Sequence, residues 1–292
     1  MLQINTFSIA AYDREENAWG VAVASKFLAA AALVSWAQAG AGAVATQAYA
    51  KVGYGPQGLA RLADGESAAD VLAALLAEDD KRESRQVGIV DAQGNAAAHT
   101  GSECSSWAGH RVGEGFCCQG NILAGEIVVD SMATTYQATE GELADRLLAA
   151  LRAGDRAGGD RRGKQSAGVL VVKPKGGYGG DTDRYLDLRV DDHLNPVSKL
   201  GELVQAHHLF FGEAKAEDQT HITPEIAREL QTMLIQTDYM QGEADGHWDE
   251  LTKQAFWGLV GDENLEERWN LEGDTDRIDR VALDYLRRRF RN

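Results

Sequence analysis

The stretch "TFSIAAYDREENAWGVAVAS", residues 6–25, decides the fold because it predicts two short strands joined by a turn. Residues 7–12 and 19–24 alternate apolar residues with small or polar ones, as strands of a packed sheet do. The link "DREENA", residues 13–18, is polar and turn-like, so we expect the two strands to form a hairpin. Thr6 stands at the start of this hairpin.

The pattern of short strands and longer helices continues to about residue 211. Its order is strands, helices, strands, helices, strands and a last helix, with the strands grouped in pairs. Such grouping indicates mostly antiparallel sheets covered by helices, an α+β fold. Expected strands lie at 42–46, 85–101 (two strands), 115–125, 166–174 and 184–192, and expected helices at 56–65, 66–80, 126–137, 142–154 and 196–211.

The composition changes at "GEAKAEDQTH", residues 212–221, which is polar and acidic like a linker. We therefore expect a first domain at 1–212, a linker at 213–221 and a second domain at 222–292. The second domain contains three helical runs and no convincing strand, so it is predicted to be small and all-helical.

The chain has 292 residues and a net charge of −16, which argues against nucleic acid or an anionic membrane as partner. Its first residues show no secretory signal, and no apolar run is strong enough to span a membrane. Three Cys do not make a disulfide framework. We expect a cytoplasmic protein, and the spacing of His, Cys and acidic residues predicts neither a metal site nor a cofactor.

Nine blocks between about Thr6 and Leu209 resemble, in order, the family catalogued as domain of unknown function 1028. Among them are "GVAVASKFLA", "AGAVATQAYA", "RQVGIVDAQGN", "CCQGNILAG" and "GGDRRGKQSAGVLVV". The resemblance implies an N-terminal-nucleophile (Ntn) hydrolase-like fold, a four-layer αββα sandwich. The tail resembles a peptidoglycan-binding-like module through Leu230, Gln231, Gly242, Asp245, Gly246 and Phe256.

Hydrolases of the Ntn type use a Thr, Ser or Cys whose own α-amino group is the general base. By this resemblance Thr6 is the candidate nucleophile, provided that the Asn5–Thr6 bond is cut. In the chain as it stands, the nitrogen of Thr6 is an amide and cannot take up a proton. The alternative is that Thr6 begins a strand only because β-branched residues suit strands.

Supporting residues are expected where related hydrolases carry polar groups. Ser25 and Lys26 follow the second strand, and a Lys ammonium there would lower the pKa of a nearby amine, or the side chain is only solvated. Asn121 is expected to help stabilise an oxyanion, or to be a turn residue at a helix entry. Gln47 and Gln119 are candidates for substrate binding; the alternative for Gln47, which the sequence favours, is the pairing of buried backbone groups.

The glycine-rich loop "GGDRRGKQS", residues 158–166, is the other candidate for substrate binding. Its residues Asp160, Arg161 and Arg162 could hold a substrate carboxylate, or they could belong to a structural ion-pair network.

These residues support two hypotheses. The first is an amidohydrolase that acts on a small amide, an N-acyl compound or a ureido compound. The second is a non-catalytic binding or assembly protein, whose tail binds a peptidoglycan-like glycan or mediates formation of a homodimer or a larger homo-oligomer.

Overall fold

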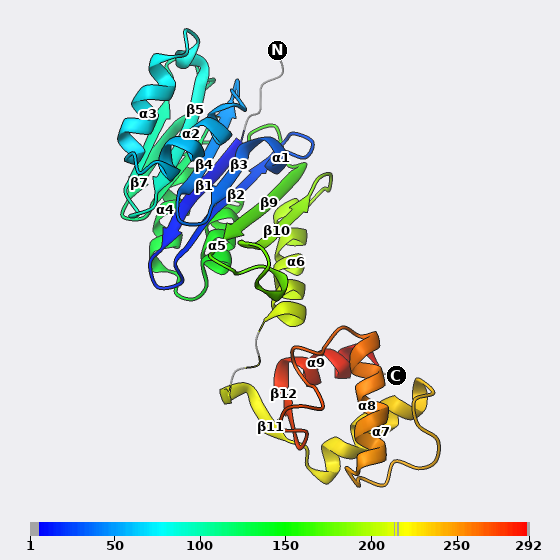
Figure 1. Ribbon diagram of the computed structural model, residues 1–292. Helices are drawn as coiled ribbons and strands as arrows, with labels where there is room; N and C mark the ends of the chain where they lie inside the picture. The colour runs from blue at the N-terminus through cyan, green and yellow to red at the C-terminus, as the bar shows by residue number, and fades with distance from the viewer. Residues whose placement is uncertain (1–5, 213, 215, 291–292) are drawn as a thin grey trace. The chain divides into compact units, whose positions relative to one another are not determined.

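The computed structural model describes residues 6–212, 214 and 216–290 (Figure 1). Contacts within the chain divide it into two units, Met1–Val204 (unit 1) and Gln205–Asn292 (unit 2), which we describe separately. The division falls inside the helix α6 (Pro196–Phe211), before the polar stretch in which the composition changes. Among the described residues, no helix is both long enough and apolar enough to cross a bilayer.

The predicted hairpin is confirmed, and it forms the centre of the larger sheet of unit 1. Its strands are β1 (Thr6–Asp13) and β2 (Ala18–Ser25), which pair antiparallel with Thr6 opposite Ser25. Asn17 in the turn has a φ of 50°, a left-handed conformation that Asn adopts more readily than most residues.

Unit 1 contains two antiparallel sheets. The larger has the strand order β10-β9-β2-β1-β8-β7, and the smaller has the order β3-β4-β5-β6. The remaining strands of the larger sheet are β7 (Gly109–Gly113), β8 (Phe116–Gly120), β9 (Ser166–Val172) and β10 (Arg184–Val190). Those of the smaller sheet are β3 (Ser35–Gln38), β4 (Gly42–Ala48), β5 (Arg85–Asp91) and β6 (Ala96–Thr100).

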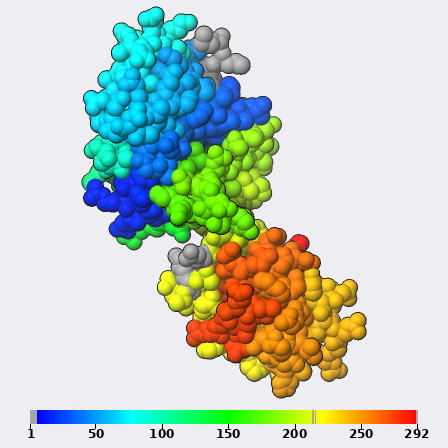
Figure 2. All heavy atoms as spheres, viewed as in Figure 1, coloured from blue at the N-terminus to red at the C-terminus, as the bar shows by residue number. Residues whose placement is uncertain are grey.

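Helices cover the outer face of each sheet, so the expected four layers of helix, sheet, sheet and helix are confirmed (Figure 1). The helices α4 (Ile127–Ala138) and α5 (Leu143–Arg156) pack on the larger sheet. The helices α2 (Tyr54–Ala63) and α3 (Ala68–Ala77) pack on the smaller sheet and form an outer surface of unit 1 in the space-filling view (Figure 2). The short pieces are α1 (Ala31–Val34), η1 (Arg82–Ser84) and η2 (Tyr178–Gly180).

The alternation along β1 determines what lies on each side of the larger sheet. Phe7 and Ile9 pack against the helices, and burial of each side chain contributes about 1.5–3 kcal/mol. Ala10 faces the smaller sheet, where it meets small residues such as Ala43 and Ala45. Small side chains allow the two sheets to approach closely. Thr6 and Ser8 lie on this same face of β1, toward the smaller sheet.

Unit 2 consists mainly of the helices α7 (Pro224–Gln236), α8 (Glu250–Asp262) and α9 (Arg280–Arg289). The side chain of Thr223 caps α7 by accepting a hydrogen bond from the backbone nitrogen of Ile226. The prediction of an all-helical tail is wrong in one detail, since β11 (Gln219–His221) and β12 (Arg277–Asp279) form a short antiparallel ribbon after η3 (Ala216–Asp218). These strands have only three residues each, too few for any periodic pattern.

A buried ion pair fixes the start of unit 2. Arg268 donates to Asp279 at 3.0 Å, and both side chains are nearly inaccessible to solvent. The same guanidinium donates to the carbonyl of Leu209 at 3.0 Å and to that of His208. These carbonyls lie in the last turns of α6, where helical partners run out, so Arg268 satisfies them.

Candidate functional site

A row of hydroxyl groups crosses one end of the larger sheet, on the face toward the smaller sheet. Thr6 lies opposite Ser25 on β2, and Ser25 lies opposite Ser166 on β9. The hydroxyl of Thr6 donates to Oγ of Ser25 at 3.1 Å. On its other side, the Thr6 carbonyl accepts a hydrogen bond from the backbone nitrogen of Asn121 at 3.0 Å. Thr6 therefore lies between Ser25 and Asn121, and all three residues are buried.

Four buried side-chain amides lie beside this row, and Gln86 is their hub. Its Nε2 donates to the carbonyl oxygens of Gly120 at 2.8 Å and of Gly109 at 3.1 Å, so this end of the amide must be the NH2 group. Its Oε1 then accepts from Nε2 of Gln47 at 2.8 Å and from Nδ2 of Asn121 at 2.9 Å. Backbone carbonyls thus fix the orientation of Gln86, and Gln86 fixes that of Asn121.

The same reasoning orients the amide of Gln119. Nε2 of Gln47 also approaches the carbonyls of Thr6 and Gln119, each at 3.3 Å, so its Oε1 is the atom that accepts from the Ser8 hydroxyl at 2.7 Å. Because Ser8 donates to Gln47, its oxygen accepts from Nε2 of Gln119, also at 2.7 Å. We call Gln47, Gln86, Gln119 and Asn121 the amide cluster.

Two oxygens of the amide cluster are buried and have no hydrogen-bond donor among the described residues, Oδ1 of Asn121 and Oε1 of Gln119. Oε1 of Gln119 packs on Gly88, where a Cβ would come within 2.2 Å of it. The cluster is therefore short of donors rather than of acceptors, and it favours a group that brings N–H or O–H hydrogens.

The cluster reaches one ionisable side chain through Thr100. Nε2 of Gln86 also lies 2.9 Å from Oγ1 of Thr100, and that hydroxyl lies 2.9 Å from Nδ1 of His110. Burial lowers the pKa of His110, with smaller contributions from nearby positive charges. A neutral ring accepts from Thr100 and ends the chain of hydrogen bonds.

Two strained residues adjoin the cluster. Ala48 has a φ of 64° and directly follows Gln47, and Ile122 has a φ of 51° and directly follows Asn121. Left-handed backbone costs such residues about 1–3 kcal/mol each, and strain of this kind concentrates at functional sites. The strain therefore marks the same end of the two sheets as the hydroxyl row does.

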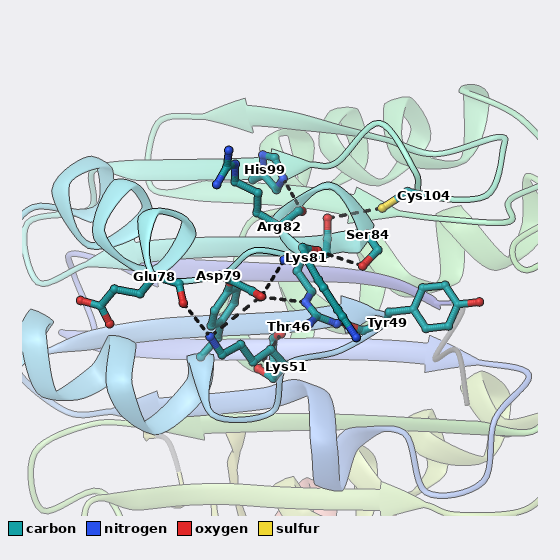
Figure 3. Close-up of polar contacts among 12 residues, drawn as sticks. Thr46, Tyr49, Lys51, Glu78, Asp79, Lys81, Arg82, Ser84, His99 and Cys104 are labelled. Atoms are coloured by element: carbon teal, nitrogen blue, oxygen red, sulfur yellow. Dashed lines mark hydrogen bonds and ion pairs between the residues drawn. The ribbon is translucent and has the colours of Figure 1, made fainter. Parts of the chain in front are cut away.

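A second polar cluster holds the turn after Ala48 (Figure 3). Asp79 accepts from the hydroxyl of Tyr54 and from Nε of Arg85, both at 2.9 Å, and Lys51 lies 3.9 Å away. Burial acts to raise the pKa of Asp79, but the hydrogen bonds it accepts outweigh burial and hold its pKa at about 2. Arg85 also donates to the carbonyl of Tyr49, so this ion pair anchors the chain just beyond β4.

The basic loop forms a separate group next to the hydroxyl row. Asp160 is buried and accepts from the backbone nitrogen of Lys26 at 2.9 Å and from the guanidinium of Arg162 at 2.6 Å. Arg162 thus holds a carboxylate of its own loop. The ammonium of Lys26 donates to the carbonyl of Lys164 at 3.3 Å, and the side chain of Arg161 is exposed.

A cavity of about 60 Å³ lies between this loop and the end of the larger sheet. Phe7 and Ala24 line it on the helix side of the sheet, and the ion pair of Asp155 with Lys164 also borders it. Ser25 lines the cavity as well, so it connects the cavity with Thr6 on the other face. The volume has room for on the order of two water molecules.

The sequence-based candidates therefore fall into two groups. One contains Thr6, Ser25, Gln47, Gln119 and Asn121, and the other contains Lys26, Asp160, Arg161 and Arg162. Sequence reasoning missed Ser8 and Gln86, although each is a polar residue within a buried strand. Within the described residues, no group of three or more His, Cys, Asp or Glu is placed to hold a metal ion.

In unit 2, the residues of the expected turn lie together. The side chain of Gln231 is buried and donates to Asp245 and to the carbonyl of His247, both at 2.9 Å. Its oxygen accepts from the backbone nitrogen of Gly246 at 2.7 Å. The turn is thus held to α7 by one amide, and Phe256 lies in the adjacent core.

Comparison with known proteins also divides the chain into two parts, close to the boundary between unit 1 and unit 2. A family of unknown function, DUF1028, matches residues 6–200, and a "Putative peptidoglycan binding domain" matches residues 210–286. A crystal structure from Silicibacter pomeroyi, described under DUF1028, is 33% identical with a TM-score of 0.64. It covers 71% of this chain, and this chain covers 91% of it. A search of curated proteins found no match. The protein therefore belongs to the DUF1028 family.

Proposed function

We propose that this protein hydrolyses a small amide, N-acyl or ureido compound, with Thr6 as the nucleophile once its nitrogen has been freed from Asn5. The observation that carries the proposal is the chemistry around Thr6. The hydroxyl row and the amide cluster consist of hydroxyl and amide side chains, none of which is a base near neutral pH. A free α-amino group on Thr6 supplies the missing base.

The reaction follows from these groups. The α-amine takes the proton of Oγ1, Oγ1 attacks the substrate carbonyl carbon, and the C–N bond breaks as the leaving amine takes the proton away. Water then hydrolyses the ester formed on Thr6. Nδ2 of Asn121 has a second hydrogen besides the one donated to Gln86, and this hydrogen or a nearby backbone N–H stabilises the oxyanion. The exposed Arg161 is available for a carboxylate of the substrate.

The test uses a chain that begins at Thr6, released from a cleavable N-terminal fusion partner. Release of amine from N-acyl amino acids and ureido compounds is measured for this chain and for its Thr6→Ala and Thr6→Ser variants. We expect hydrolysis with Thr6, weaker hydrolysis with Ser and none with Ala. Equal rates for the Ala variant and the parent chain would exclude Thr6 as the nucleophile.

A second candidate function is non-catalytic binding on the same scaffold. It is favoured by the burial of Thr6, whose side chain has 0% exposure in the intact chain. If the intact and the Thr6-first chains both lack hydrolase activity, yet the intact chain binds small N-acyl compounds by calorimetry, this function is supported. Hydrolysis by the Thr6-first chain would show that burial of Thr6 in the intact chain does not prevent catalysis, and non-catalytic binding would then lose its support.

We propose that unit 2 binds a peptidoglycan-like glycan, or else joins copies of the chain into a homodimer or larger oligomer. The match to the peptidoglycan-binding family supports the glycan. Sedimentation with purified sacculi, compared between the full chain and residues 1–211, tests glycan binding. Light scattering on the same two proteins tests assembly, and equal results in both experiments would exclude both roles.

A further inference from the structure

Within the part of the chain that the structure describes, the side-chain oxygen of Asn121 has no hydrogen-bond donor, although the residue has 0% exposure. Its direction is not arbitrary, because Nδ2 must point to Oε1 of Gln86, which two backbone carbonyls hold in place. A buried acceptor without a donor costs about 1–3 kcal/mol, so its retention calls for an explanation.

The residue beside this oxygen is Thr6. β1 and β8 pair with Phe7 opposite Gly120, which places Thr6 opposite Asn121, and the Asn121 nitrogen donates to the Thr6 carbonyl. Opposed residues of an antiparallel pair have side chains on the same face, with Cβ atoms about 4.5–5.5 Å apart. The amide of Asn121 therefore lies within reach of groups at the start of β1.

Cutting the bond before Thr6 changes the number of donors at this place. A peptide nitrogen carries one hydrogen, a free amine carries two and an ammonium carries three. The freed nitrogen thus brings new N–H donors to the point where the amide cluster has an acceptor to spare.

We propose that Oδ1 of Asn121 accepts a hydrogen bond from the freed amino group of Thr6 and so orients that group toward Oγ1. Asn121 is then a positioning residue whose acceptor is satisfied only after cleavage. This inference rests on the proposed function, since it requires a free Thr6.

The experiment measures the pKa of the Thr6 amino group by NMR in the chain from Thr6 to Asn292, labelled with 15N-threonine. An acceptor favours the charged amine, so Asn121→Leu should lower this pKa by about one unit, and Asn121→Asp should raise it by at least about one unit. The pH–rate profile of any hydrolysis should shift in the same directions. Gln119→Leu is the matched control, because it removes the other cluster oxygen that has no donor among the described residues. That oxygen faces Gly88, so this variant should leave the pKa of the Thr6 amine unchanged.

A second measurement needs no substitution. In the unmodified Thr6-first chain, the side-chain NH2 resonances of Asn121 should titrate with the pKa of the Thr6 amine. If they do not titrate, or if both Asn121 variants keep the parental pKa to within about 0.2 units, the proposal is overturned. Hydrolysis with an unchanged pKa would refute only the role of Asn121. If the Asn121 variants shift the pKa of the Thr6 amine but the Thr6-first chain hydrolyses none of the compounds, only the proposed function is refuted.

Discussion

Replacement of Gln86 by Leu tests whether the amide cluster is organised as described. Leu has a similar volume but neither donates nor accepts hydrogen bonds, so the substitution removes the hub and leaves the surrounding packing nearly unchanged. The carbonyl of Gly120 and Nδ2 of Asn121 would both lose the hydrogen bonds that Gln86 makes with them.

The size of the effect follows from those two groups. Each buried polar group left without a partner costs about 1–3 kcal/mol, and the additional apolar burial of Leu recovers part of this. We therefore expect unit 1 to lose roughly 3 kcal/mol of its free energy of unfolding. With a urea dependence of about 2 kcal/mol per M, the midpoint of unfolding should fall by about 1.5 M.

The assay must report on the two units separately. The chain has six Trp, with Trp19, Trp36 and Trp107 in unit 1 and the other three in unit 2. Urea titration of 5-fluorotryptophan-labelled protein by 19F NMR therefore gives one unfolding curve for each unit. Only the unit 1 resonances should shift their midpoint in Gln86→Leu.

The matched control is Gln57→Leu, because Gln57 is an exposed residue of α2 in the same unit. Exposed substitutions of this kind change stability by no more than about 0.5 kcal/mol. If Gln86→Leu shifted the midpoint no more than Gln57→Leu does, the hydrogen bonds assigned to Gln86 would be refuted.

Three further predictions concern other residues. The folded pKa of Asp79, about 2, lies below its ordinary value of 3.8, so its stabilisation is complete above about pH 4 and is lost as the pH falls toward 2. Asp79→Asn should therefore destabilise unit 1 at neutral pH and remove this part of its acid sensitivity, as measured by urea titration at several pH values. If the variant lost as much unfolding free energy between about pH 4 and about pH 2 as the parent chain does, this role of Asp79 would be contradicted. Gly88→Ala places a Cβ 2.2 Å from Oε1 of Gln119 and should cost about 2 kcal/mol or more in the same assay, whereas a neutral result would mean that Gln119 points elsewhere. Gly246→Ala combines a φ of +86° with a Cβ 2.8 Å from the carbonyl of Pro224, so only the unit 2 resonances should unfold earlier, by about 1–3 kcal/mol.

The layers of unit 1 could be predicted from the sequence because the hairpin at residues 6–25 has a clear alternation and the helices have clear apolar faces. The strand β3 (Ser35–Gln38) was not predicted, because four residues carry too little periodicity to show a strand. The strands β11 and β12 escaped prediction for the same reason.

The candidate site was predictable only in part. Thr6 and Asn121 lie more than one hundred positions apart, and it is the strand register that makes them neighbours. The role of Gln86 depends on carbonyls of Gly109 and Gly120, and backbone groups leave no trace in a sequence. The sequence left open whether Arg162 holds a substrate carboxylate or belongs to an ion-pair network, and in the structure its guanidinium binds Asp160, two residues away in the same loop.

The position of α6 has a practical consequence for expressing parts of this protein. Its first half supplies Val197, Leu200 and Val204 to the core of unit 1, while Leu209 belongs to the core of unit 2. A gene fragment that begins after residue 212 would lack the two carbonyls to which Arg268 donates, and of these described contacts the guanidinium would keep only the ion pair with Asp279. The two halves should instead be cloned as overlapping segments, 1–211 and 205–292, so that residues 205–211 are encoded in both.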